Sequence, residues 1–148
     1  MTYHHLLVPS DGTQRSQAAL AQAIDLAKVL GAKVTLLHVQ PPLPVGLMGM
    51  GDMLDPATVD SLQSTVAEDS RRILADAKAT AAKEGLEIEA EVVKQDLPHR
   101  AIVEAAQRHG CDLIVMASHG RRGLSSLLLG SETQRVLLHA SVPVLVVR

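Results

Sequence analysis

The sequence is almost without aromatic residues: its 148 positions include no Phe, no Trp and a single Tyr. Its hydrophobic core must therefore be aliphatic. Recognition of single-stranded nucleic acid depends heavily on aromatic side chains that stack on bases, so this shortage argues against that function. A formal net charge of −2 also leaves no basic surface for DNA or for an anionic membrane. We expect no nucleic-acid partner.

Cysteine is equally scarce, and the one present, Cys111, excludes both a disulfide framework and a cysteine metal cluster. It precedes an apolar run, where a buried and inert thiol is expected. No apolar stretch approaches the roughly 20 residues of a membrane-spanning helix. The N-terminus lacks the charged and apolar regions of a secretory signal. We therefore expect one cytoplasmic domain, residues 1–148, without a membrane span.

Short apolar runs alternate with longer helical patterns along the chain. The runs predict five strands, at residues 5–8, 34–39, 88–93, 113–117 and 142–147. Residues 34–39 and 113–117 are almost continuously apolar, which is typical of strands covered on both faces. Residues 88–93 instead alternate between apolar and polar side chains, so this strand is expected near an edge of the sheet.

Periodicity and helix-end signals predict four helices between these strands. The first spans about residues 16–30 and ends at Gly31 in a left-handed cap. The second opens at Asp55 and Pro56 and runs to Gly85; its apolar face comprises Val59, Leu62, Val66, Ile73 and Ala77. The third runs from about residue 96 to Gly110. The fourth starts at Ser131, where a capping-box pattern is formed by Ser131, Glu132, Thr133 and Gln134.

This alternation predicts an α/β fold: a doubly wound, five-stranded parallel sheet of the flavodoxin-like class, with strand order 3-2-1-4-5 and helices on both faces. Ligands bind to such sheets beyond the carboxyl ends of the strands, where neighbouring connections diverge to opposite faces. Here that point lies between the first and fourth strands. Residues 9–12 and 118–130, which follow these strands, are therefore expected to form a site.

The second of these loops is rich in glycine, with Gly120, Gly123 and Gly130 between a buried strand and a helix. Glycine allows a ligand to approach the backbone and permits a positive φ, and a helix N-terminus offers free amides to an anion. Ser131 can donate its hydroxyl to a phosphate or cap its own helix. No lysine follows Lys94, so this is not a Walker A loop. The site is better suited to holding a nucleotide than to hydrolysing it.

On these residues the sequence resembles the universal stress protein family over its whole length. The resemblance is carried by residues 8–11, 37–39, 112–120 and 130–131 and by the closing segment 141–147. The ATP-binding branch of that family has Gly, two residues, Gly, nine residues, Gly and then Ser or Thr. This chain has the second glycine as Gly120, the nine-residue spacing, and Gly130 followed by Ser131. It departs at the first position, where Ala117 replaces glycine.

The resemblance implies an adenine-nucleotide-hydrolase-like fold that binds ATP, with Mg²⁺ or Mn²⁺. Asp11 and Val39 would line the adenine and ribose, and the residues at the start of the last helix would surround the phosphates. His119 lies inside the loop and is a further phosphate candidate. The full predicted site is Pro9, Ser10, Asp11, Val39, Met116, Ala117, His119, Gly120, Gly130, Ser131, Glu132 and Thr133. Asp11 has a second interpretation as a turn-forming residue before the first helix.

We expect a homodimer formed through the C-terminal strand, from Val142 to Val147, because this apolar strand would otherwise leave an edge exposed. The leading functional hypothesis is a dimeric regulatory module that senses adenine nucleotide in the stress response. One alternative is a slow ATPase or a self-phosphorylating protein, with Ser118, Ser125, Ser126 or Ser131 as acceptor. Another is a structural dimer that no longer binds nucleotide. Residues 40–55, which include three methionines, are either a connection or a lid or partner surface.

Overall fold

The computed structural model describes residues 2–40, 42–43, 55–119 and 128–148. Most of the methionine-rich connection, including Met48, Met50 and Met53, lies outside these ranges. The described elements, in chain order, are β1 (His5–Pro9), α1 (Gln14–Leu30), β2 (Lys33–Gln40), α3 (Pro56–Lys83), β3 (Glu89–Lys94), α4 (Pro98–His109), β4 (Leu113–Ala117), α5 (Ser131–His139) and β5 (Val144–Val147). The strands form one parallel sheet of order β3-β2-β1-β4-β5. The predicted fold class and strand order are confirmed.

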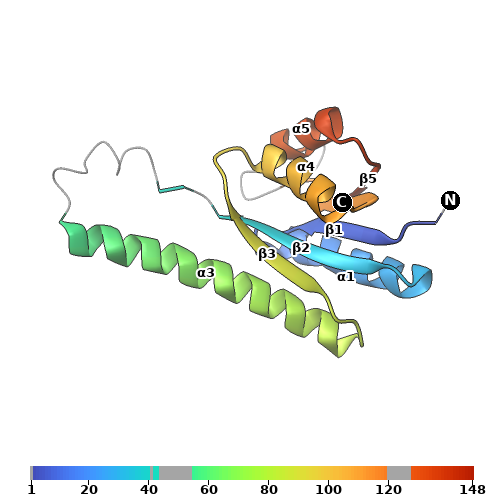
Figure 1. Ribbon diagram of the computed structural model, residues 1–148, viewed down its shortest axis with the longest axis horizontal. Coiled ribbons are helices and arrows are strands. Elements are labelled where there is room, and N and C mark those ends of the chain that lie inside the picture. Colours follow the sequence, from blue (N-terminus) through green and yellow to red (C-terminus); the bar gives the residue numbers. More distant parts are fainter. Residues whose placement is uncertain (1, 41, 44–54, 120–127) are drawn as a thin grey trace.

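Two hydrophobic cores lie on opposite faces of this sheet, because successive side chains of a strand point to opposite sides. On one face Leu6 and Leu36 pack with Ile24 of α1 and with Ala77 of α3. On the other, Leu7, Leu37 and Ile114 pack with Ile102 of α4 and Val136 of α5. Figure 1 shows α1 and α3 together on one side of the sheet and α4 and α5 on the other. Both cores are aliphatic, as the composition requires.

Cys111 is buried in the core beneath α4. Burial raises the pKa of its thiol to about 11, and the negative charges of Asp112 and Glu89 act in the same direction. Since the thiolate is the reactive form of cysteine, this agrees with the expected inert thiol.

The strand boundaries shift by one or two residues at several ends. The last strand begins at Val144 rather than at Val142, because its ladder with β4 starts with the pair Ile114 and Val144. Pro143 has no N–H to give to a ladder, although its carbonyl still accepts from the Ile114 amide at 3.0 Å. The predicted edge position of residues 88–93 is confirmed, since β3 is a terminal strand of the sheet.

Helix α1 begins two residues before the predicted start at Ser16. Its N-cap is Thr13, whose hydroxyl accepts from the Ser16 amide at 3.3 Å. The predicted left-handed cap at Gly31 is confirmed by its φ of 67°. Helix α4 stops at Gly110 as predicted, and this glycine is also left-handed, with φ 66°. Asp55 caps α3 as expected, with its carboxylate accepting from the Thr58 amide at 2.9 Å.

Helix α3 is packed against the sheet along only part of its length. Its 28 residues span about 42 Å at 1.5 Å per residue, and Figure 1 shows its N-terminal end extending past the sheet. Ile73 and Ala77 are buried, whereas Val59, Leu62 and Val66 are only partly covered. The predicted apolar face is therefore a core face in the second half of the helix alone. Among the described helices, none combines the length and apolar character needed to cross a membrane.

Candidate functional site

The described residues of the predicted site lie at or just beyond the carboxyl ends of the three central strands. Pro9 ends β1, Val39 is the penultimate residue of β2, and Ala117 ends β4. Since β2, β1 and β4 are parallel neighbours, their carboxyl ends share one edge of the sheet. Ser118 then leads toward Gly130, which precedes α5. Gly120, Gly123, Ser125 and Ser126 lie outside the described residues.

The turn between β1 and α1 is held by its own polar side chains. The Asp11 carboxylate accepts from the Thr13 amide at 3.0 Å, from the Thr13 hydroxyl at 2.6 Å and from the Ser16 hydroxyl at 2.5 Å, all through Oδ1. These contacts support the interpretation of Asp11 as a turn-forming residue. Sequence reasoning missed Thr13 and Ser16 as its partners, although Thr13 and Ser16 are spaced as a helix cap and the third helical residue.

Gly12 is required in this turn for two reasons. Its φ is +79°, which other residues rarely adopt, and a Cβ on it would lie 2.8 Å from Cγ1 of Ile73 in α3. The turn is also tied to the neighbouring strand. Ser10 donates its amide to the Leu37 carbonyl at 2.8 Å, and its carbonyl accepts from Nδ1 of the buried His38 at 2.8 Å. Because a carbonyl can only accept, His38 carries a proton on Nδ1.

Hydrogen bonds to the backbone carbonyl of Ser118 join the end of β4 to the start of α5. This carbonyl accepts from the Gly130 amide at 2.7 Å and from the Thr133 hydroxyl at 3.2 Å. The same hydroxyl donates to the Ala117 carbonyl at 3.0 Å, and Thr133 is buried. The side chain of Thr133 therefore fixes α5 against the end of β4, which leaves only its backbone amide for a phosphate.

The predicted capping box at Ser131 is wrong. The N-cap is Gly130, α5 has no side-chain cap, and Ser131 is the exposed first helical residue. The Gln134 side chain donates to the Leu129 carbonyl at 2.8 Å instead of to the helix start. Gly130 also has φ −60° and ψ 151°, so it does not use the positive φ that glycine permits. The backbone conformation at this position is therefore open to residues other than glycine.

Glu132 stabilises a different helix from its own. One oxygen of its carboxylate accepts from the His99 amide at 2.9 Å and from His99 Nδ1 at 3.2 Å, and the other from Arg135 at 2.6 Å. Helix α4 has no side-chain cap from its own N-cap residue, Leu97, so Glu132 supplies one. Burial alone would raise the pKa of Glu132, but the hydrogen bonds from Arg135 and His99 outweigh it and the pKa is lowered.

Among the described residues of the predicted site, only His119 has a buried side-chain polar atom without a partner. The residue is 5% exposed, and its Nδ1 lies 3.0 Å from the Ser118 hydroxyl. Its Nε2 is buried and has no hydrogen-bond partner among the described residues. An unpaired buried polar group costs about 1–3 kcal/mol, so a ligand that paired with Nε2 would recover part of that cost.

The start of α5 and the unpaired Nε2 of His119 together favour the binding of an anion at this site. The first amides of a helix, here those of Ser131, Glu132 and Thr133, have no acceptor in the preceding turn, and the helix dipole adds positive character at the same end. No three His, Cys, Asp or Glu side chains gather into a metal site in the part of the chain that the structure describes.

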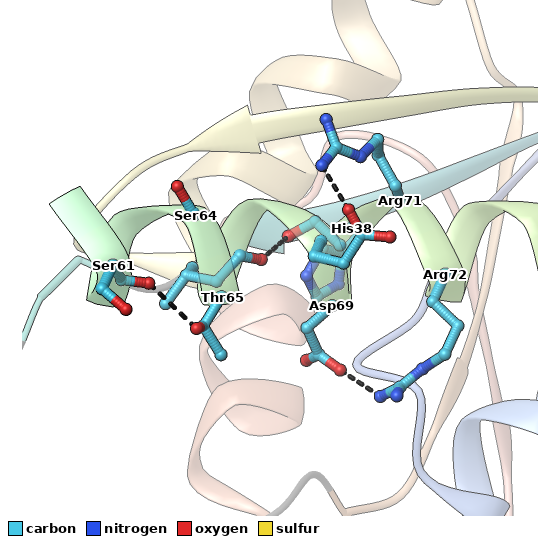
Figure 2. Close-up of a pocket in the computed structure, with 10 residues that line it drawn as sticks. His38, Ser61, Ser64, Thr65, Asp69, Arg71 and Arg72 are labelled. Atoms are coloured by element: carbon cyan, nitrogen blue, oxygen red, sulfur yellow. Dashed lines mark hydrogen bonds and ion pairs between the residues drawn. The ribbon is translucent and has the colours of Figure 1, made fainter.

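Two hollows that sequence reasoning did not predict flank α3. One of about 630 Å³ is lined by His38 and by residues 61, 64–66 and 68–72 of the helix. Figure 2 shows its arginines paired along the helix, Arg71 with Glu68 and Arg72 with Asp69. The other, of about 770 Å³, lies between α3, Gln40 and Lys94. No described lining residue of either hollow belongs to the predicted site, and the paired charges leave the first without evident selectivity for an anion.

Residues 2–148 match the universal stress protein family. The chain is 34% identical to the universal stress protein MJ0531 of Methanocaldococcus jannaschii, over 99% of this chain and 82% of the relative. In fold it is similar to the universal stress protein UspA of Lactobacillus plantarum, with a TM-score of 0.81, 25% identity, and coverage of 100% of this chain and 99% of the other.

A third similar protein is a universal stress protein crystallised in complex with cAMP. Its TM-score is 0.70 at 25% identity, with coverage of 100% of this chain and 98% of the other. The sheet order, the full-length match and the shared identity lead to one conclusion: this chain belongs to the universal stress protein family.

Proposed function

We propose that this chain binds an adenine nucleotide, ATP together with Mg²⁺ or Mn²⁺, and acts in the cytoplasm as a dimeric regulatory module of the stress response. The observation that carries the proposal is the N-terminus of α5. It has no side-chain cap, it is held against the end of β4 by the bond from Gly130 to Ser118, and the unpaired Nε2 of His119 lies in the residue that follows Ser118.

The proposed site has two parts, which follow the family resemblance. The adenine and ribose end would comprise Pro9, Ser10, Asp11, Val39, Met116 and Ala117. The phosphate end would comprise His119, Gly130, Ser131, Glu132 and Thr133, together with Gly120. The side chains of Glu132 and Thr133 are already engaged with His99 and with the end of β4, so these two residues would contribute their backbone amides. Ser131 is an exposed residue, and its hydroxyl can donate a hydrogen bond to a phosphate.

The relative crystallised with cAMP supports the choice of an adenine nucleotide. ATP and cAMP share an adenine, a ribose and a phosphate; they differ in the two further phosphates of ATP and in the cyclic 3′,5′-diester of cAMP. A helix N-terminus favours additional negative charge, so it favours ATP. The absence of a P-loop lysine after Lys94 predicts that bound ATP turns over slowly.

The test is to identify what the protein holds and prefers. Mass spectrometry of small molecules released from freshly purified protein is expected to detect ATP. Calorimetric titration of the emptied protein with ATP, AMP and cAMP, each with and without Mg²⁺, is expected to rank ATP with Mg²⁺ first. Equal affinity for AMP and ATP would show that the α5 N-terminus does not bind the outer phosphates. No binding of any of the three would favour the structural dimer instead.

The dimer is proposed through β5, because the two edges of the sheet differ. β3 carries Glu89, Glu91 and Lys94, and charges on an edge discourage pairing with another chain. β5 is Val-Leu-Val-Val, and its Leu145 is 42% exposed. Two leucines of the neighbouring α5, Leu137 and Leu138, are exposed as well. Pairing β5 with its copy around a two-fold axis would cover this edge in both subunits.

Sedimentation velocity tests this assembly. The unmodified protein is expected to sediment as a dimer at micromolar concentration, and Leu145→Lys is expected to shift it to a monomer because it places like charges at the paired edge. Glu89→Lys, at an exposed position on the opposite edge, is the matched control and should remain dimeric. A dimer that persists in Leu145→Lys would place the interface elsewhere.

A further inference from the structure

Two histidine rings meet where α4 lies beside α5. His99 is the second residue of α4, and His139 is the last residue of α5. Their ring centres are 5.5 Å apart, and the ring planes are tilted by 39°. The side chain of His99 is 16% exposed, and His139 is an exposed residue. A solute can therefore reach the pair from solvent.

The Nδ1 atom of each ring lies against an acceptor. His99 Nδ1 is 3.2 Å from a Glu132 carboxylate oxygen, and His139 Nδ1 is 2.8 Å from the Arg135 carbonyl oxygen. A carbonyl can only accept a hydrogen bond, and the same holds for an ionised carboxylate. The lowered pKa of Glu132 keeps its carboxylate ionised at neutral pH. Both rings therefore carry a proton on Nδ1, which leaves the lone pair of the neutral imidazole on Nε2.

This arrangement is the one found in histidines that bind a metal through Nε2. Such a histidine almost always donates its other ring N–H to a carboxylate, a backbone carbonyl or water, and this bond orients the ring and raises its basicity. His99 donates to a carboxylate and His139 to a backbone carbonyl. In the described ranges the hydrogen bonds of these two rings all run through Nδ1. Both Nε2 lone pairs are thus available to a metal ion.

The spacing and the charges around the two rings also suit one shared ion. Zinc lies about 2.1 Å from an imidazole nitrogen, so two nitrogens on the same ion are at most about 4.2 Å apart. Rings with centres 5.5 Å apart meet this limit when their Nε2 edges turn toward each other. The nearby Arg135 guanidinium is paired with Glu132 at 2.6 Å, so its positive charge is compensated.

Other histidines of the described chain lack this combination. His4 Nδ1 lies 3.3 Å from the Asp112 carboxylate, and His109 Nε2 lies 2.6 Å from the Glu91 carboxylate. Within the residues that the structure describes, however, His99 and His139 are the one pair of imidazole rings in contact. A carboxylate beside a histidine therefore does not distinguish this place, whereas the second ring does.

We propose that His99 and His139 bind one divalent transition-metal ion, Zn²⁺ or its neighbours Ni²⁺ and Cu²⁺, through their Nε2 atoms. Imidazole nitrogen suits these ions, whereas Mg²⁺ prefers oxygen ligands. Water would complete the coordination, since no third His, Cys, Asp or Glu of the described chain joins the group. The ion would link the start of α4 to the end of α5. It is separate from the Mg²⁺ or Mn²⁺ proposed to accompany ATP, and the inference does not depend on nucleotide binding.

The test uses full-length, untagged protein, freed of nucleotide and metal and titrated with Zn²⁺ by calorimetry. One Zn²⁺ per chain is expected. His99→Gln and His139→Gln should each weaken binding at least as much as the roughly 10–100-fold loss typical of an outer-shell partner. His4→Gln is the matched control and should bind normally. Glu132→Gln should weaken binding less than loss of a ring, because glutamine keeps an acceptor oxygen.

Two further readouts report on the rings and on the fold. Long-range ¹H–¹⁵N spectra of the metal-free protein should show a proton on Nδ1 of both rings, and Zn²⁺ should shift both Nε2 signals. Zn²⁺ should raise the melting temperature of the unmodified protein and of His4→Gln, because it binds the folded pair, but not that of His139→Gln. Melting without metal verifies that each variant folds, and the exposed His139 provides a test if His99→Gln does not.

Each contrary result overturns the site. Unchanged Zn²⁺ affinity in His99→Gln or in His139→Gln would show that the two rings do not share an ion. An equal loss of affinity in His4→Gln would mean that Zn²⁺ binds surface histidines without selection. A proton on Nε2 of both rings would contradict the tautomers on which the site depends. No saturable Zn²⁺ binding by the unmodified protein would remove the proposal, while titration with ATP and Mg²⁺ would still test the nucleotide site independently.

Discussion

Two connections lead from a central strand into a helix at the same edge of the sheet, and the two helix starts differ in how they are capped. After β1, the side chains of Asp11, Thr13 and Ser16 bond to one another and cap α1. After β4, α5 begins at Ser131, and its N-cap, Gly130, provides no side-chain cap. Both turns precede a helix that packs on the core, so packing alone does not explain the difference.

The difference shows where a ligand is to be expected. A capped helix start has already used amides that an anion could bind, whereas an uncapped start keeps them available. In the β4–α5 connection the polar side chains that could have capped α5 are directed elsewhere: Thr133 to the end of β4 and Glu132 to α4. The first turn is therefore mainly structural, and the second is the candidate phosphate site. The following substitutions test this division.

The largest effect is expected from Gly130→Val. Valine tolerates the observed φ of −60°, but its branched side chain would project where a phosphate approaches the α5 amides. ATP affinity should fall at least about 100-fold, or roughly 2.7 kcal/mol, while the protein stays folded with a cap loss of about 1 kcal/mol. Calorimetric titration and thermal melting measure the two. Gly130→Ala, which adds one methyl, should weaken binding less. Unchanged affinity in Gly130→Val would mean that this turn is only a connection.

Asp11→Ala should act on stability more than on binding. Three hydrogen bonds converge on one carboxylate oxygen, and their loss should lower the free energy of unfolding by about 2–3 kcal/mol. Urea unfolding checks this value, and Asp11→Asn, which keeps an acceptor oxygen, should lose less. If instead Asp11→Ala keeps its stability and loses ATP affinity, Asp11 is chiefly a ligand residue and the two turns are alike.

Thr133→Val should have an intermediate effect. The substitution keeps the shape of the buried side chain and removes the hydroxyl that donates to the carbonyls of Ala117 and Ser118. The free energy of unfolding should fall by about 1–2 kcal/mol, and ATP binding should weaken because α5 is no longer fixed against β4. Thr133→Ser keeps the hydroxyl and should bind ATP nearly normally. Equal losses of affinity in both variants would show that the methyl group, not the hydroxyl, positions the helix.

The smallest effect is expected from Glu132→Gln, which weakens the cap on α4. The pKa of Glu132 is lowered on folding from its ordinary 4.5, so the charged carboxylate stabilises the folded protein above that pH. Its contribution is lost as the pH falls through the lower folded pKa. The difference between the two proteins should be below about 1 kcal/mol at neutral pH, since the pair is partly solvated. This difference in the free energy of unfolding, measured by urea unfolding, should become smaller below pH 4.5. If it does not change with pH, the charge on the Glu132 carboxylate is not the source of the stabilisation.

Much of this molecule follows from the sequence by itself. Apolar runs such as 113–117 set the strands, and the Gly31 and Gly110 signals set helix ends, because both depend on residues within a few positions of one another. The alternation of strand and helix then restricts the topology to a few parallel orders. The edge position of β3 and the burial of Cys111 were predictable for the same reason, since each reflects a local pattern of polarity.

Only the tertiary structure decided which partner each polar side chain bonds to. Ser131 and Glu132 match a capping box in sequence, yet Gly130 is the cap and Glu132 bonds to His99, 33 positions away. Thr133 likewise bonds to the end of β4. Val59 is only partly covered because the N-terminal end of α3 extends past the sheet. A hydrogen bond depends on distances of a few tenths of an ångström between atoms. Those distances exist only after the sheet has brought distant segments together, so local pattern cannot encode them.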